Sequence, residues 1–228
     1  MPSSQSAPVV ELHCQGFLFD MDGILISSIE SVERSWSKWA LMRGIDPALA
    51  CRTAHGCRAI ETVARLRPDL DAAEELKVIE EIELQDGAGI VVLPGVSQLL
   101  ATLPVGSWTV VTSATEKIAR MRLAVCNLPI PAQLVTAESV SLGKPNPAPY
   151  LKGAELLGLD AAECVVFEDA PSGTAAGRAA GATVIATPFS HSPAQLSAAH
   201  HILQDLSRLK LETDSEGWIS LRFLPING

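Results

Sequence analysis

The sequence lacks the long apolar run that a membrane-spanning helix requires, since no stretch approaches the ~20 apolar residues needed to cross a bilayer. It also lacks a basic excess. With a net charge of −9 it does not offer the positive stripe that a nucleic-acid-binding surface needs. A small anionic ligand remains compatible with this balance, because local charge at one site can oppose the net charge. We therefore expect neither nucleic acid nor a membrane as partner.

No CxxC pair occurs among the five cysteines. They are Cys14, Cys51, Cys57, Cys126 and Cys164. An odd, scattered set argues against a disulfide framework or a zinc site and favours a reducing cytoplasm. Cys57 lies two residues from His55, which allows a Cys/His nucleophile, although a semi-buried free thiol beside a binding loop is the favoured interpretation. The opening residues also lack the basic region and apolar stretch of a signal peptide, so we expect a flexible leader over residues 1–13.

What the chain does contain is ample material for a core: 47% of its 228 residues are apolar and 19% are charged. This length fits one large domain, or a core with a smaller module. No internal repeat or low-complexity tract occurs, and the glycines at 173, 177 and 181 do not match the GxGxxG pattern of a dinucleotide site.

The most informative stretch is Gly16–Gly23, where an apolar run ends in two carboxylates, Asp20 and Asp22, followed by a glycine. The near-continuous apolar run over residues 17–19 predicts a strand that is covered on both faces. Gly23 is free to adopt a positive φ and to turn the backbone. An ordinary Asp-Gly turn and a metal or phosphoryl site explain this stretch about equally well.

Three later stretches repeat the pattern of polar side chains at or after a predicted strand. Residues 108–113 are a β-branched run that ends at Ser113, where a helix over 115–126 begins and Ser113 or Thr115 can either cap it or help to bind an anion. Lys144 lies in a stiff Gly/Pro loop, where it either faces solvent or serves as a pre-organised phosphate ligand. A strand over 163–169 ends in Glu168 and Asp169.

The remaining patterns predict an α/β fold. Residues 30–90 contain only helical periodicity, with Ser28 as the first N-cap and with the glutamates of the acidic helix over 71–86 on a solvated face. After residue 91 strands alternate with helices, which indicates βαβ units and a parallel sheet. Strands are expected at 133–136, 182–186 and 201–203, and a hairpin over 209–224. We expect the core to comprise 14–28 and 93–228, with 29–92 inserted over the strand tips.

All the polar strand-end residues would then converge on one edge of the sheet. Carboxylates around a hard cation favour Mg²⁺, and Ser113, Lys144 and loop N–H groups would neutralise a substrate phosphate. One carboxylate can attack phosphorus, while a second protonates the leaving oxygen and later deprotonates water.

As a set, these stretches resemble the four motifs of the haloacid dehalogenase superfamily of phosphohydrolases, in order and in spacing, over essentially the whole chain. The matching stretches are Asp20-Met21-Asp22-Gly23, Thr112-Ser113, Lys144-Pro145 and Glu168-Asp169. The stretches 55–58, 143–151 and 165–173 are similar to the sugar-phosphate phosphatases of the 2-deoxyglucose-6-phosphate and glycerol-phosphate branch.

The resemblance implies a Rossmann-like three-layer core with an inserted helical cap, and a role for each matching residue. Asp20 would be the nucleophile and Asp22 the general acid/base. Asp20, Asp22 (through its carbonyl) and Asp169 would bind Mg²⁺, with Glu168 as a further candidate. Ser113, Ala114 and Lys144 would hold the phosphate, and His55 and Arg58 of the cap would meet the substrate.

The expected activity is Mg²⁺-dependent hydrolysis of a small phosphorylated sugar or polyol through an aspartyl-phosphate. A phosphosugar mutase similar to β-phosphoglucomutase is the main alternative, and a non-catalytic phospho-ligand sensor is a second. A dehalogenase fits less well, because it needs neither Mg²⁺ nor the acid/base at position 22. The partner is then a small phosphorylated metabolite, and the chain would be a monomer or a weak homodimer.

Overall fold

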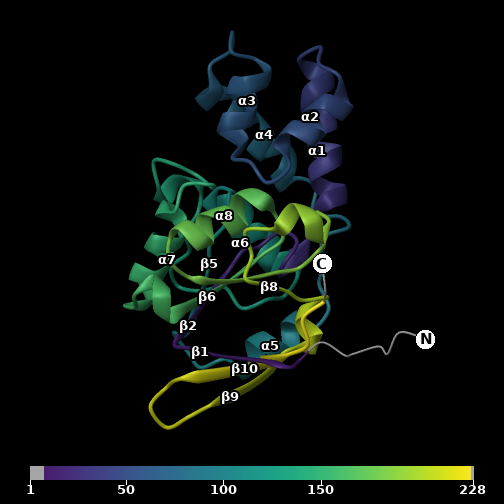
Figure 1. The fold of residues 1–228 in the computed structure, drawn as a ribbon. Coiled ribbons are helices and arrows are strands. Elements are labelled where there is room, and N and C mark those ends of the chain that lie inside the picture. The colour runs from purple at the N-terminus through teal and green to yellow at the C-terminus, as the bar shows by residue number, and fades with distance from the viewer. Residues whose placement is uncertain (1–7, 227–228) are drawn as a thin grey trace, which may run out of the picture.

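The central element is a parallel sheet of five strands in the order β5-β2-β6-β7-β8, seen in a computed structural model that describes residues 8–226 (Figure 1). Its strands are β5 (Trp108–Val110), β2 (Gly16–Phe19), β6 (Cys164–Glu168), β7 (Thr183–Ala186) and β8 (His201–Ile202). Every pairing within this sheet is parallel. The predicted α/β class with a parallel sheet is therefore confirmed.

Alternate residues of β2 pack on opposite faces of the sheet, which produces three layers. Phe17 and Phe19 belong to one core cluster, which also holds apolar side chains of α5 and α6. Leu18 points to the other cluster, with side chains of α7 and α8. The helices are α5 (Val96–Thr102), α6 (Glu116–Val125), α7 (Ala148–Leu157) and α8 (Pro171–Ala179). This burial on both faces explains why β2 and β6 are continuous apolar runs.

Four helices lie together at one end of the molecule, beyond the sheet (Figure 1). They are α1 (Ile29–Met42), α2 (Pro47–Ala54), α3 (Ala59–Leu66) and α4 (Ala72–Leu84), called the helical segment below. The chain enters and leaves it through an antiparallel pair, β3 (Ile26–Ser27) and β4 (Val91–Val92). The helical segment has its own core, in which Trp36 and Trp39 pack edge to face at 5.4 Å. Both tryptophans therefore belong to the core of this segment.

A second, antiparallel sheet closes the opposite end of the molecule, with the strand order β1-β10-β9. It combines β1 (Val10–Cys14) with the hairpin β9 (Lys210–Thr213) and β10 (Ile219–Phe223). The predicted C-terminal hairpin is confirmed. The flexible leader is wrong for residues 10–13, because alternate side chains of β1 pack on the core while its backbone pairs with β10. Residues 1–7 of that expected leader lie outside the described residues.

Three local predictions also need correction. Residues 133–136 do not form a strand: only Val135 pairs, in a single parallel bridge with Val111, because Thr136 already begins a 3-10 turn. Ser28 does occupy the N-cap of α1, but its hydroxyl donates to Asp22 instead of capping the helix.

The 3-10 helices are η1 (Ala137–Ser139), η2 (Ala161–Glu163), η3 (Pro193–Leu196) and η4 (Leu206–Arg208). Within residues 8–226, none of the helices combines the length and the apolar character that crossing a bilayer demands.

The third correction concerns α4, whose glutamates do not all face solvent. Glu75 and Glu83 are buried. The carboxylate of Glu75 accepts hydrogen bonds from the indole of Trp39 at 2.8 Å and from Nε of Arg43 at 2.7 Å, so it ties α4 to α1. A buried carboxylate needs such partners to offset its lost hydration, and the sequence pattern alone does not reveal them.

Candidate active site

A cleft lies between the carboxyl edge of the central sheet and the helical segment. Its lining combines the loops after β2, β5 and β6 with side chains of α1, α2 and α4. It includes these residues that the sequence predicts for the site: Asp20, Asp22, His55, Ser113, Ala114, Lys144, Glu168 and Asp169. Folding therefore brings together groups that lie up to about 150 positions apart in the chain, because parallel strands end at a common edge.

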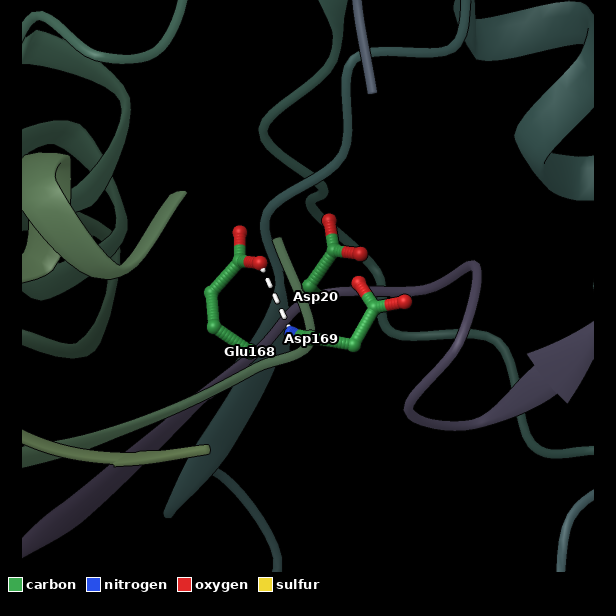
Figure 2. A group of neighbouring side chains, drawn as sticks. All are labelled: Asp20, Glu168 and Asp169. Carbon is green, nitrogen blue, oxygen red and sulfur yellow. Dashed lines mark hydrogen bonds between the residues drawn. The ribbon is translucent and has the colours of Figure 1, made fainter. Parts of the chain in front are cut away.

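Three buried carboxylates lie at the centre of this edge. Asp20 follows β2, Glu168 ends β6 and Asp169 follows it, and each offers an oxygen within 4.8 Å of the others. Figure 2 shows the carboxylates of Asp20 and Asp169 side by side, whereas that of Glu168 lies apart from them and accepts a hydrogen bond from the backbone N–H of Asp169. Burial raises the pKa of Asp20 well above its usual range, with Lys144 opposing this shift. This cluster of buried carboxylate oxygens could hold a metal ion.

Lys144 neutralises part of this charge. Its ammonium donates to Oδ1 of Asp20 at 2.6 Å, to Oε1 of Glu168 at 2.6 Å and to the carbonyl of Val111 at 3.1 Å. Its side chain is only 5% exposed. Burial lowers the pKa of Lys144, but the two carboxylates outweigh burial and raise the pKa above its usual value. The sequence left open whether this lysine faces solvent, and the structure places it inside the cleft wall.

Glu168 has a different set of contacts from the two aspartates. Oε1 accepts from Lys144 and from the hydroxyl of Tyr150 (2.7 Å), while Oε2 accepts from the backbone N–H groups of Asp169 and Ala170 at 3.0 and 3.1 Å. These four bonds use the acceptor positions of a carboxylate. A Cβ at Gly173 would lie 1.7 Å from Oε1, so only glycine leaves room for this arrangement. The geometry favours Asp20 and Asp169 as metal ligands and Glu168 as the support of Lys144.

Asp22 is held at both carboxylate oxygens. Ser28 donates its hydroxyl to Oδ1, and a guanidinium N–H of Arg122 donates to Oδ2 at 2.9 Å. Gly23 has a φ of 90°, as its predicted turn requires, and a Cβ there would lie 2.0 Å from Oδ2 of Asp169. The tight turn after β2 can therefore pass against the Asp169 carboxylate only because residue 23 is glycine.

The loop after β5 lines the cleft with Thr112, Ser113, Ala114 and Thr115. The amide of Ala114 donates to the hydroxyl of Thr112 at 3.1 Å. Neither Ser113 nor Thr115 caps α6, because Thr115, at the N-cap, makes no capping bond and Glu138 accepts from the amide of Glu116 instead. The hydroxyl of Thr115 is buried and has no hydrogen-bond partner among residues 8–226.

The two residues expected to meet the substrate from the helical segment are placed differently. His55 lines the cleft, with its ring 6.1 Å from that of His191. Arg58 is not among the lining residues. Its guanidinium donates to the carbonyls of Ala137 (2.8 Å) and Ser141 (3.1 Å), in the loop that leads to Lys144. In this structure Arg58 therefore joins the helical segment to the core, and it does not face a ligand.

Cys57 also lines the cleft. Burial raises the pKa of its thiol, which disfavours the thiolate that a nucleophilic cysteine requires. The free-thiol interpretation is therefore favoured over a Cys/His nucleophile.

Sequence reasoning missed Arg122 and Glu83, which meet in the cleft wall at 2.9 Å. A signal for both was present. Arg122 falls on the buried stripe of α6, at helical spacing from Ile118 and Ala119, and Glu83 follows Ile79 and Ile82 on α4. A charged residue on an apolar stripe is buried only when a partner compensates its charge.

Comparisons with known proteins identify the family to which the chain is similar. The family model of the haloacid dehalogenase-like hydrolases matches residues 17–187. The chain is 40% identical over 211 residues to hexitol phosphatase A of Escherichia coli (strain K12), covering 90% of this chain and 98% of that protein. It is 34% identical over 194 residues to glycerol-1-phosphate phosphohydrolase 1 of Saccharomyces cerevisiae, covering 79% and 78% of the two chains.

A solved structure shares the fold. The crystal structure of a hydrolase from Pseudomonas syringae superimposes with a TM-score of 0.74 at 25% sequence identity. The match covers 84% of this chain and 94% of the other.

Proposed function

The chain belongs to the haloacid dehalogenase-like hydrolases and is a phosphoric monoester hydrolase, and from this premise we propose that it hydrolyses monophosphates of sugars or polyols in a Mg²⁺-dependent reaction. The observation that carries the proposal is the position of Asp20 in the cleft. Its carboxylate accepts a hydrogen bond from Lys144, and one of its oxygens lies within 4.8 Å of a carboxylate oxygen of Asp169. The names of the two relatives support the substrate class.

The proposed reaction has two displacements at phosphorus. In the first, a carboxylate oxygen of Asp20 forms a bond to phosphorus while the ester bond breaks, and Asp22 gives a proton to the departing alcohol. In the second, Asp22 takes a proton from a water molecule, which attacks the aspartyl-phosphate and releases inorganic phosphate. Lys144, Ser113 and Ala114 would bind the phosphate oxygens.

The donor set fits a hard cation. Asp20 and Asp169 supply buried carboxylate oxygens that face each other, and the Asp22 carbonyl is the third candidate ligand. When bound, Mg²⁺ would reduce the repulsion between these carboxylates and the substrate phosphate.

Metal binding should be linked to the charge of Asp169. Burial and the neighbouring Glu168 raise the pKa of Asp169 to about 7, from a usual value near 3.8. Between these values the folded chain binds more protons than the unfolded chain, so stability without metal falls as pH rises through this window. Because Mg²⁺ binds the ionised carboxylate, we expect it to raise the Tm more at pH 8 than at pH 5.5.

Thermal denaturation with Mg²⁺ and with EDTA at the two pH values measures this difference. The variant Asp169→Asn is the control, and Mg²⁺ should not raise its Tm at either pH. An equal rise in Tm at pH 5.5 and pH 8 would count against Asp169 as a ligand.

The leaving-group side of the cleft favours an uncharged alcohol. From the helical segment, the lining of the cleft includes Glu33 and Glu80 together with the buried Trp36 and Ile79. Among the described residues that line the cleft, the lysine and arginine side chains are those of Lys144 and Arg122. Each is already paired with two carboxylates. A second phosphate would thus meet negative charge. This counts against the mutase alternative, which must hold a bisphosphate.

A phosphate-release screen with Mg²⁺ tests the proposal. We expect hexitol, hexose, pentose and glycerol monophosphates to exceed bisphosphates and carboxylated monophosphates in kcat/KM by about tenfold or more, since one uncompensated like-charge contact costs on the order of 1 kcal/mol or more. The variant Glu80→Gln should narrow this gap. Formation of an isomerised sugar phosphate without release of free phosphate would establish a mutase. Binding of a phosphorylated ligand without turnover would establish a sensor.

A further inference from the structure

Arg122 is a buried cation that touches the predicted acid/base from outside the four motifs. It lies on α6, and its side chain is 6% exposed. One guanidinium nitrogen donates to Oδ2 of Asp22 and the other to Oε2 of Glu83, both at 2.9 Å. The three side chains therefore form a row in which one positive charge is shared by two carboxylates.

The row joins three separate parts of the chain. Asp22 belongs to the loop after β2, Arg122 to α6 in the core, and Glu83 to α4 in the helical segment, which packs against α6. The side chain of Glu83 is only 10% exposed. The segment is attached through the short pair β3 and β4, so a displacement of α4 away from α6 would separate Glu83 from Arg122.

Geometry explains why the second carboxylate matters to the first. A guanidinium is planar, and its N–H groups form a rigid fork, so fixing one nitrogen fixes the direction of the other. Glu83 thus orients the N–H group of Arg122 that donates a hydrogen bond to Asp22. Ser28 holds the opposite oxygen of Asp22, so the carboxylate is constrained from both sides.

We propose that Arg122, oriented by Glu83, is a positioning residue that holds the Asp22 carboxylate in place for proton transfer while α4 is seated on the core. The proposal rests on the proposed phosphatase function and on the role of Asp22 in it. It adds that the acid/base is complete only when the helical segment contributes Glu83.

The test compares two substrates that differ in their need for a proton. The alcohol of a hexitol or glycerol phosphate requires protonation as it leaves, whereas the phenolate of p-nitrophenyl phosphate does not. The parameter kcat/KM reports the steps up to formation of the aspartyl-phosphate, so it isolates the leaving-group step from the later attack of water. Asp22→Asn, the reference, should lose far more on the alkyl phosphate than on the aryl phosphate.

The variant Glu83→Leu removes the acceptor and keeps the volume. We expect its kcat/KM to fall roughly 10- to 100-fold on the alkyl phosphate and less than about threefold on the aryl phosphate, because general acid catalysis typically contributes 10²- to 10⁴-fold. Glu83→Gln, which keeps an acceptor oxygen, should recover most of the loss. Arg122→Gln should show the same split, and the double variant Glu83→Leu/Arg122→Gln should lose no more than Arg122→Gln alone.

The controls come from the same two helices. Glu81→Gln on α4 and Arg120→Gln on α6 change charges outside the row of Asp22, Arg122 and Glu83, and should leave kcat/KM for both substrates unchanged. Equal losses on the two substrates for Glu83→Leu, or no loss, would overturn the inference while the phosphatase function stands. A wild-type protein that hydrolyses neither substrate would overturn both. If Arg122→Gln fails to fold, Glu83→Leu and Glu83→Gln decide the question by themselves.

Discussion

Replacing Asp20 by asparagine should abolish phosphate release, with a loss on the order of 10⁴-fold or more, as is found when other enzymes lose a nucleophile. An amide cannot form the acyl phosphate, whereas the side chain keeps its size. Its carbonyl oxygen can still accept the hydrogen bond that Lys144 now donates to Oδ1. The loss therefore measures the missing nucleophile, with little change in the shape of the site.

The same variant should be at least as stable as the wild type when metal is removed. Burial raises the pKa of Asp20, so its ionisation costs stability in the folded state above its usual pKa. The neutral asparagine avoids this cost, and we expect a gain of roughly 1 kcal/mol near pH 8 that shrinks toward acid pH, in the range known for relieved functional sites. Denaturation in EDTA measures it.

Asp214→Asn is a matched control, since this aspartate lies in the exposed turn of the β9–β10 hairpin and its replacement can still accept from the amides of Glu216 and Trp218. It should leave phosphate release unchanged. Digestion of the wild type after rapid acid quenching should yield a phosphorylated peptide that contains Asp20, and the variant should yield none. Near-wild-type turnover by Asp20→Asn would exclude the aspartyl-phosphate.

The fold class could be predicted because each core strand has a local signature. The runs at Phe17–Phe19 and Val165–Phe167 are apolar on both faces, which suits a strand covered by helices on two sides. Strand β1 could not be predicted in the same way. Its alternation is short, and it becomes a strand only through pairing with β10, about 200 residues later, which is a tertiary contact.

For the candidate site too, residues fixed by local sequence patterns could be predicted, whereas residues fixed by tertiary contacts could not. Positions such as Asp20, Glu168 and Asp169 could be placed because they depend on the ends of parallel strands, which share an edge. The orientation of Arg58 could not, since it depends on how the helical segment is seated on the loop at Ala137 and Ser141. The pairing of Arg122 with Glu83 needed the same information, although their places on apolar stripes already indicated burial.

The largest effect on stability is expected for Lys144→Met. This variant leaves the buried carboxylates of Asp20 and Glu168 without the cation that now lies 2.6 Å from each. Removing one partner of a buried ion pair typically costs about 3–5 kcal/mol, because the remaining charge is uncompensated. We expect a loss of that size near pH 8, together with loss of phosphate release, and a smaller loss near pH 5, because burial raises the pKa of Asp20 and favours its uncharged form at acid pH.

Combining Lys144→Met with Glu168→Gln separates the two roles of the lysine. The glutamine can keep its carbonyl on the amides of Asp169 and Ala170 and turn its NH₂ toward the hydroxyl of Tyr150, so one buried charge disappears without a lost contact. Stability should then recover in large part, while phosphate release stays absent because no ammonium remains to bind the phosphate. Lys152→Met is the control, since this lysine pairs with Glu155 at the surface of α7, where a substitution changes stability by about 0.5 kcal/mol or less. A Lys144→Met protein that is as stable as the wild type at pH 8 and still releases phosphate would mean that the lysine neither balances these carboxylates nor binds the substrate.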